Sequence, residues 1–210
     1  VVNLGALPAR AAAGKIALIP AVASGLVAEV SMSAEASVPL AARLLALGRK
    51  FGWRVIFTGA GGPIDKRLRA SLSAAISYME SNGLARSVIA AALGSYGIGV
   101  SPRGPFPEAP PEAEGILQAC IAALANQGSR LLADAVARRP SDIDAVAVLG
   151  GLFPRWQGGP MFQADRQGLL VMRADLIKRA QTAPQLYAPD PLWDELIANG
   201  QDFGTMNGAA

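Results

Sequence analysis

The stretch RRPSDIDAVAVLGGLFPRWQGGPMFQADRQG, residues 138–168, decides the fold of this chain. Ser141 followed by Asp144 is the pattern of a capping box that opens a short helix. Gly150 and Gly151 end that helix, and Pro160 is well placed at the first position of the next one. The stretch therefore predicts a tightly packed helical corner, in which no residue pattern points to a nucleophile, a metal cage or a phosphate loop.

The composition indicates a folded, largely helical chain. Its 210 residues are 51% hydrophobic with a mean hydropathy of +0.31, and only 6% are aromatic. The net charge of +3 comes from scattered basic residues without a concentrated basic face, which argues against nucleic-acid binding. The longest uncharged apolar stretch, residues 16–28, is too short for a membrane span. Because the start lacks both Met and a basic signal region, we expect a piece of a longer protein.

The sequence contains no histidine. It therefore holds no Ser-His-Asp or Cys-His arrangement and no imidazole base for chemistry near neutral pH. Cys120 is the single cysteine, so an intramolecular disulfide is impossible, and we expect a buried structural thiol in a reducing, cytoplasmic compartment. A zinc site would have to be built from carboxylates and one cysteine, so no bound metal is expected.

The first part of the chain predicts strands. Apolar runs at residues 15–20, 26–32 and 53–58 have strand length and the near-continuous character of strands in a parallel sheet. Between the second and third runs, a helix capped by Ser37 completes a strand–helix–strand unit. Such a unit predicts a parallel pair with a right-handed crossover.

The remainder of the chain, from Ile64, predicts helices. Besides the two helices of the corner, apolar periodicity predicts helices over 64–82, 85–93, 112–139, 169–180 and 191–199. We expect a frayed tail from Gly204 and a domain junction in the Gly- and Pro-rich residues 95–111. These patterns divide the chain into a sheet remnant (1–60), a truncated first helical domain (61–105) and a second helical domain (106–210).

The residues SDIDAVAVLGGLFPRWQGGPMFQAD, numbers 141–165, resemble the last helical domain of 3-hydroxyacyl-CoA dehydrogenases, in the form found in bifunctional enzymes of fatty acid β-oxidation. The resemblance implies an α+β, mostly helical fold. It comprises a remnant of a Rossmann-type parallel sheet, with two or three strands, followed by two all-helical domains like the C-terminal domains of the family. A faint echo of the corner in residues 101–106 agrees with the family's pair of related helical domains.

In this family, NAD binds an N-terminal glycine-rich turn of the Rossmann domain. The present sequence has no G-x-G-x-x-G between a strand and a helix. The nearest candidate, residues 59–63, contains a proline that lacks a backbone N–H, and it resembles the family's linker into the helical domain. We therefore expect no cofactor in this chain.

Catalysis in the family relies on a His base that a Glu orients, helped by a Ser and an Asn that bind the substrate oxygen. The resemblance places Gly5 at the Ser and Ile16 at the His. It places Lys66 at the Asn, while Glu29 keeps the orienting position. Without the proton acceptor, the chain alone is expected to be inactive as a dehydrogenase. Glu29 is then a remnant or solvated carboxylate, because acting as a base by itself would require a raised pKa.

Binding of acyl-CoA is a separate question. Lys66, Arg67 and Arg69 open the long helix near the place of the family's substrate groove, which makes them candidates to contact the CoA phosphates. A charged outer helix face is the alternative, and the commoner, interpretation. Arg155 and Trp156 are further candidates to line a groove, against the alternative of a guanidinium stacked on an indole at a packing corner.

Two functions follow from these residues. The first is the C-terminal part of a 3-hydroxyacyl-CoA dehydrogenase-like protein of β-oxidation whose own site has decayed, with acyl-CoA as its ligand. The second is a non-catalytic helical module for dimerisation or assembly, with a second copy or a partner subunit, because packing motifs persist where the chemistry does not. A third interpretation is a fragment whose missing N-terminal part completes the sheet, since two or three strands leave an exposed edge.

Overall fold

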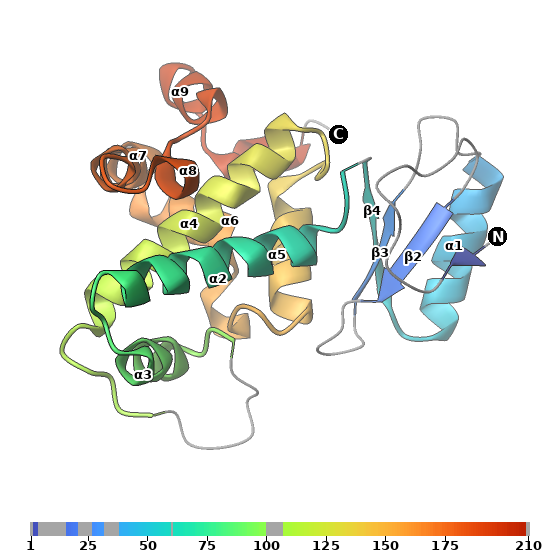
Figure 1. Ribbon diagram of the computed structural model, residues 1–210. Coiled ribbons are helices and arrows are strands. Elements are labelled where there is room, and N and C mark those ends of the chain that lie inside the picture. Colours follow the sequence, from blue (N-terminus) through green and yellow to red (C-terminus); the bar gives the residue numbers. More distant parts are fainter. Residues whose placement is uncertain are drawn as a thin grey trace.

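The structure, a computed structural model, describes residues 2–3, 16–20, 27–31, 38–59, 61–99 and 107–208. A small sheet with one covering helix lies beside a larger helical body (Figure 1). The expected fold class, mostly helical with a remnant of a Rossmann-type sheet, is confirmed. Gly5, Ser37 and residues 100–106 of the expected junction lie outside the described residues.

The sheet has four strands in the order β1-β2-β3-β4. Their bounds are Val2–Asn3 (β1), Ile16–Pro20 (β2), Val27–Ser31 (β3) and Arg54–Thr58 (β4). β3 and β4 are parallel and are joined through α1 (Val38–Lys50), as the strand–helix–strand pattern predicts. The parallel direction expected for the first run is wrong, because β2 is antiparallel to β3. Only residues 21–26 connect these strands, too few for the crossover that a parallel pair needs.

The helical body follows the predicted order of helices. It contains α2 (Ile64–Ser81), α3 (Arg86–Tyr96), α4 (Ala113–Ala133), α5 (Pro140–Leu149), α6 (Pro160–Gln167), α7 (Leu169–Ala180), α8 (Pro184–Tyr187), α9 (Pro191–Ala198) and the 3-10 helices η1 (Arg155–Gln157) and η2 (Phe203–Gly208). Within the described ranges, none of these helices is long and apolar enough to cross a membrane.

The structure differs from the prediction at the end of α4 and in the C-terminal tail. α4 was expected to reach Arg139 but ends at Ala133, because Ala135 adopts a left-handed φ of 53°. The turn brings the chain to the end of β4, where the Gly59 N–H donates to the Val136 carbonyl at 2.9 Å. The prediction of a frayed tail from Gly204 is also wrong, because residues 204–208 belong to η2, which the fully buried ring of Phe203 anchors to the core.

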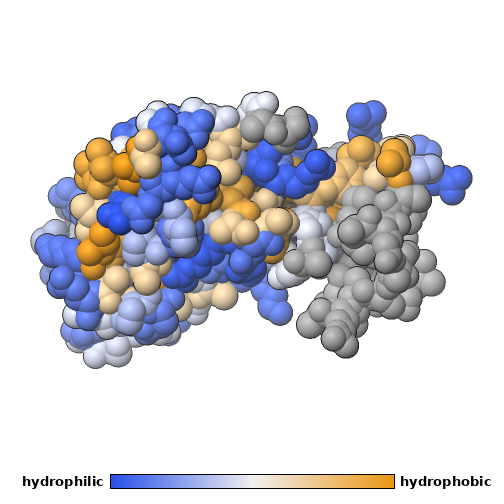
Figure 2. Space-filling model, turned by 90° about the horizontal axis from the view of Figure 1, so that it is seen from above, coloured by the Kyte–Doolittle hydropathy of each residue, from blue (hydrophilic) through white to orange (hydrophobic). Residues whose placement is uncertain are grey.

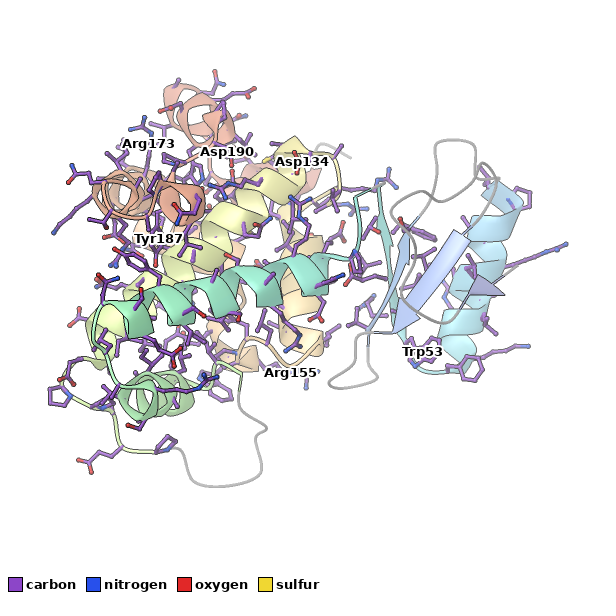
Figure 3. The ribbon with its side chains drawn as sticks, in the orientation of Figure 1. Trp53, Asp134, Arg155, Arg173, Tyr187 and Asp190 are labelled. Atoms are coloured by element: carbon purple, nitrogen blue, oxygen red, sulfur yellow. The ribbon has the colours of Figure 1, made fainter. Side chains whose placement is uncertain are left out.

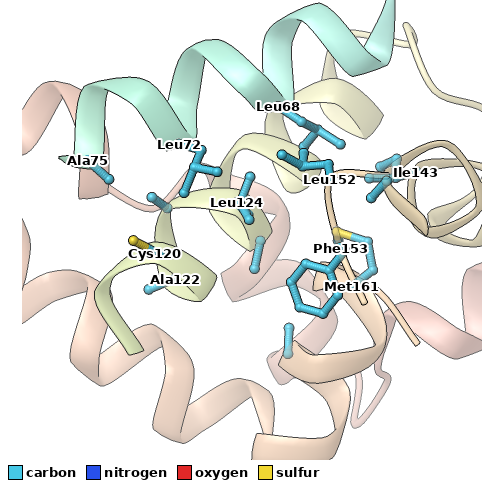
Figure 4. Close-up of a cluster of buried hydrophobic side chains, with 14 of the residues drawn as sticks. Leu68, Leu72, Ala75, Cys120, Ala122, Leu124, Ile143, Leu152, Phe153 and Met161 are labelled. Atoms are coloured by element: carbon cyan, nitrogen blue, oxygen red, sulfur yellow. The ribbon is translucent and has the colours of Figure 1, made fainter. Parts of the chain in front are cut away.

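One hydrophobic core runs through the helical body. Leu68 and Leu72 of α2 meet Leu124 of α4 and Met161 of α6 in this core (Figure 4). Cys120 is fully buried there, and burial raises the pKa of its thiol to about 12, so the predicted structural thiol is confirmed. α2 and α3 thus share a core with α4, while the division into two helical domains stays a prediction.

Asp144 joins two helices at the corner. The predicted capping box is wrong, because α5 already begins at Pro140 and the Ser141 N–H donates to Oδ1 of Asn207. Asp144 instead accepts the N–H groups of Met161 (2.8 Å) and Phe162 (3.0 Å), at the start of α6. Burial raises the pKa of this carboxyl to about 7, against the lowering effect of both hydrogen bonds. The carboxylate caps α6 across the corner instead of capping its own helix.

Removing this cap tests the corner. We expect Asp144→Ala to lower the free energy of unfolding by about 1–2 kcal/mol, because two N–H groups lose their acceptor. Ser141→Ala, the matched control, is expected to change it by less than about 0.5 kcal/mol. Urea denaturation followed by circular dichroism measures both. A larger loss in Ser141→Ala would restore the capping-box interpretation.

Candidate functional site

Glu29 lies where the sheet meets the helical body. It comes from the middle of β3 and is only 1% exposed. Its carboxylate accepts the N–H of Ile64 at 2.5 Å and the N–H of Asp65 at 2.9 Å. These residues begin α2, whose own N-cap, Pro63, provides no side-chain acceptor. Glu29 therefore caps α2 from a distant strand, where the positive end of the helix favours its charge.

A chain of polar contacts continues from Glu29 to α5. The Asp65 carboxylate accepts from Nε of Arg69 at 2.8 and 3.0 Å, and Nη2 of Arg69 donates to the Gly150 carbonyl at 2.7 Å. A Cβ at Gly150 would lie 2.5 Å from the Val146 carbonyl oxygen and 3.1 Å from Oδ1 of Asp65, so this position requires glycine. The contacts tie the sheet, α2 and the end of α5 into one junction.

The protonation of Glu29 is governed by its burial. Desolvation raises the pKa of Glu29 from 4.5 to about 7, partly opposed by the two backbone hydrogen bonds. The interpretation of Glu29 as a solvated carboxylate is therefore wrong. Although a pKa near 7 suits a general base, both carboxylate oxygens are occupied by the α2 N–H groups. The arrangement favours a structural role over proton transfer.

The strand register tests the placement of the family's histidine. In the β2–β3 pair, Ile19 lies directly opposite Glu29. Ile16, the residue that the resemblance places at the histidine, lies three positions before Ile19, at the start of β2. Ile16, which the resemblance aligns with the family's histidine base, is thus not the cross-strand partner of Glu29.

Lys66 and Arg67 lie at the first turn of α2. Lys66 is exposed. Arg67 is held by an ion pair, with its Nη2 atom 2.8 Å from Oδ2 of Asp134 in the turn after α4. Its guanidinium therefore already has an anionic partner, and Lys66 is the more accessible cation of the two.

Arg155 and Trp156 lie on η1, on another side of α2. Both are exposed, and the Trp156 ring lies against Gly97, where a Cβ would be 3.1 Å from the indole. Figure 3 shows Arg155 below α2, whereas Asp134, the partner of Arg67, lies above it. The structure therefore does not gather Lys66, Arg67, Arg155 and Trp156 into one groove.

One residue of the junction, Asp65, was missed by the sequence analysis, and Arg69 was considered only as a candidate phosphate contact. Asp65 and Arg69 are four positions apart on α2, a spacing that predicts an ion pair on one helix face. That signal was available from the sequence, but the contact of Arg69 with Gly150 was not. In the part of the chain that the structure describes, no group of three or more His, Cys, Asp or Glu residues is placed to hold a metal ion.

Comparison with known proteins identifies the class of protein to which the chain is similar. Over about two fifths of its length it is homologous to multifunctional proteins of fatty acid β-oxidation, which confirms the predicted resemblance. No protein-family model matches the chain.

The particular relatives are much longer than this chain. It is 40% identical over 87 residues to the peroxisomal bifunctional enzyme of Danio rerio, and 33% identical over 91 residues to the fatty acid oxidation complex subunit alpha of Idiomarina loihiensis. The human peroxisomal bifunctional enzyme is 36% identical over 76 residues. These matches span 40%, 43% and 36% of this chain but only 12%, 13% and 10% of the relatives.

Substituting Glu29 by Gln tests the junction through its pH dependence. Because the folded state raises the pKa of Glu29, its contribution to stability is fully present below pH 4.5 and is lost as the pH rises through about 7. Between these values, the free energy of unfolding of the wild type should fall by roughly 3 kcal/mol relative to Glu29→Gln. Urea denaturation from pH 4 to 8 measures the difference. Parallel curves would show that Glu29 titrates normally.

Proposed function

We propose that this chain is a 3-hydroxyacyl-CoA dehydrogenase-like C-terminal segment of a fatty acid β-oxidation protein, without dehydrogenase activity of its own. The observation that carries the proposal is the use of Glu29. At the position of the family's orienting glutamate, its carboxylate caps α2, and the sequence contains no histidine for it to orient. The names of the relatives support the link to β-oxidation.

The loss of activity follows from the missing groups. A positioned general base contributes about 10²–10⁴ in rate, and the NAD-binding fingerprint is absent from the sequence as well. Acyl-CoA remains the ligand that the resemblance implies, and the exposed Lys66 is the better placed of the two α2 cations to contact it. A cytoplasmic location stays a prediction, because relatives include proteins named as peroxisomal.

A dehydrogenase assay tests this proposal. We expect purified chain with acetoacetyl-CoA and NADH to turn over at least about 10²-fold more slowly than a fatty acid oxidation complex subunit alpha under the same conditions. Absorbance at 340 nm reports the rate. Turnover within tenfold of that control would overturn the proposal. Loss of such turnover in Glu29→Gln, with its fold intact, would then identify Glu29 as the base.

A second candidate function, assembly, is favoured by an exposed apolar face. This face comprises Phe162 of α6 and Leu170, Val171 and Ile177 of α7, which are 41–69% exposed. Leu170 and Ile177 are seven residues apart and therefore share one side of α7. Figure 2 shows hydrophobic groups at the end of the helical body away from the sheet, the end where α7 lies in Figure 1. Such a face supports a dimerisation or assembly module.

Charges placed on this face test assembly. If the α6–α7 face mediates self-association, the double variant Leu170→Asp and Ile177→Asp should sediment as a monomer where the wild type forms a dimer. Val38→Asp is the matched control, because Val38 is 81% exposed on α1, outside this face. Sedimentation velocity over a concentration series measures the oligomeric state. A monomeric wild type would rule out self-association through this face.

A further inference from the structure

A cleft between the sheet and the helical body gathers three arginines. Arg49 comes from the last turn of α1, Arg54 from the start of β4 and Arg155 from η1. The cleft has a volume of about 430 Å³. Figure 3 shows Arg155 at the lower end of the helical body and Trp53, another lining residue, at the lower end of the sheet unit. Elements far apart in the sequence thus converge on one space.

The described lining of the cleft carries only positive charge. Among the residues that the structure describes, none that lines the cleft is acidic. The ion pairs between described residues use other arginines: Arg67, Arg69, Arg86, Arg173 and Arg179. Arg49, Arg54 and Arg155 are exposed residues that each line this space, and a bound anion would offset the repulsion between their positive charges. Their planar forks match phosphate oxygens in two-point hydrogen bonds.

The rest of the lining favours an organic ligand over an inorganic ion. Leu45, Val55 and Trp53 supply apolar surface, and Trp53 is held in place by stacking on Phe51 with ring centroids 4.9 Å apart. The volume lies within the range of small-molecule sites and far exceeds that of one phosphate ion. A ligand with an apolar or aromatic portion would cover this wall while its anionic end meets the arginines.

We propose that this cleft binds an organic diphosphate of the nucleotide type, with Arg49, Arg54 and Arg155 on its phosphate oxygens. Both a free nucleoside diphosphate and the adenosine diphosphate portion of coenzyme A offer this chemistry. Because Arg155 belongs to the helical body and the other two arginines to the sheet unit, the ligand bridges the two parts. The inference rests on the cleft alone and is independent of the absence of dehydrogenase activity.

Calorimetric titration of the chain at low salt tests the site. ADP and coenzyme A are expected to bind with submillimolar Kd and to raise the Tm. Each of Arg49→Ala, Arg54→Ala and Arg155→Ala should weaken binding by about tenfold or more. Arg43→Ala is the matched control, because Arg43 is an exposed arginine of α1 outside the cleft, and it should leave the Kd unchanged. Circular dichroism verifies that each variant is folded.

The ligands separate the possible outcomes. Tighter binding of coenzyme A than of both dephospho-coenzyme A and ADP would identify coenzyme A as the source, whereas equal binding would identify nucleotides in general. If pyrophosphate binds as tightly as ADP, the proposal that the ligand has an organic portion is overturned. No heat with any of these ligands at millimolar concentration, or equal losses in Arg43→Ala and the cleft variants, would overturn the site. Turnover in the dehydrogenase assay would overturn only the proposed function.

Discussion

The position of the sheet depends on one buried carboxylate. Glu29 provides the acceptor for the first N–H groups of α2, which Pro63 cannot cap. α2 in turn packs along α4 in the main core, so the direction in which α2 begins sets where the helical body lies relative to β3. The contact between Gly59 and Val136 fixes the same junction from the end of β4. Loss of the Glu29 cap would leave orphan donors at a buried helix start.

Partly buried carboxylates also cap helix starts within the helical body. Asp144 accepts two N–H groups at the start of α6, and Asp165 accepts those of Phe203 and Gly204 at η2. Burial raises the pKa of all three carboxyl groups, so each carries a desolvation cost that its hydrogen bonds partly offset. In a core that includes many small alanine side chains, which pack in many ways, such directional contacts specify one arrangement of the helices.

The sequence predicted what is local and missed what is distant. Helix positions followed from apolar periodicity. Single residues correctly predicted that Gly150 ends α5 and that Pro160 begins α6. The capping roles of Glu29 and Asp144 join residues 35 and 17 positions apart, which no spacing rule reports. Arg155 was a candidate groove residue from the sequence, but its place beside Arg49 and Arg54 was missed, because only the fold brings them to one cleft. The absence of a histidine, in contrast, could be read directly.

Glu29 has a structural role that needs no reacting residue beside it. In this chain its two oxygens hold the helix start, so replacing it would cost stability whether or not any substrate binds. A buried glutamate that joins sheet to helix in this way is not by itself a sign of catalysis.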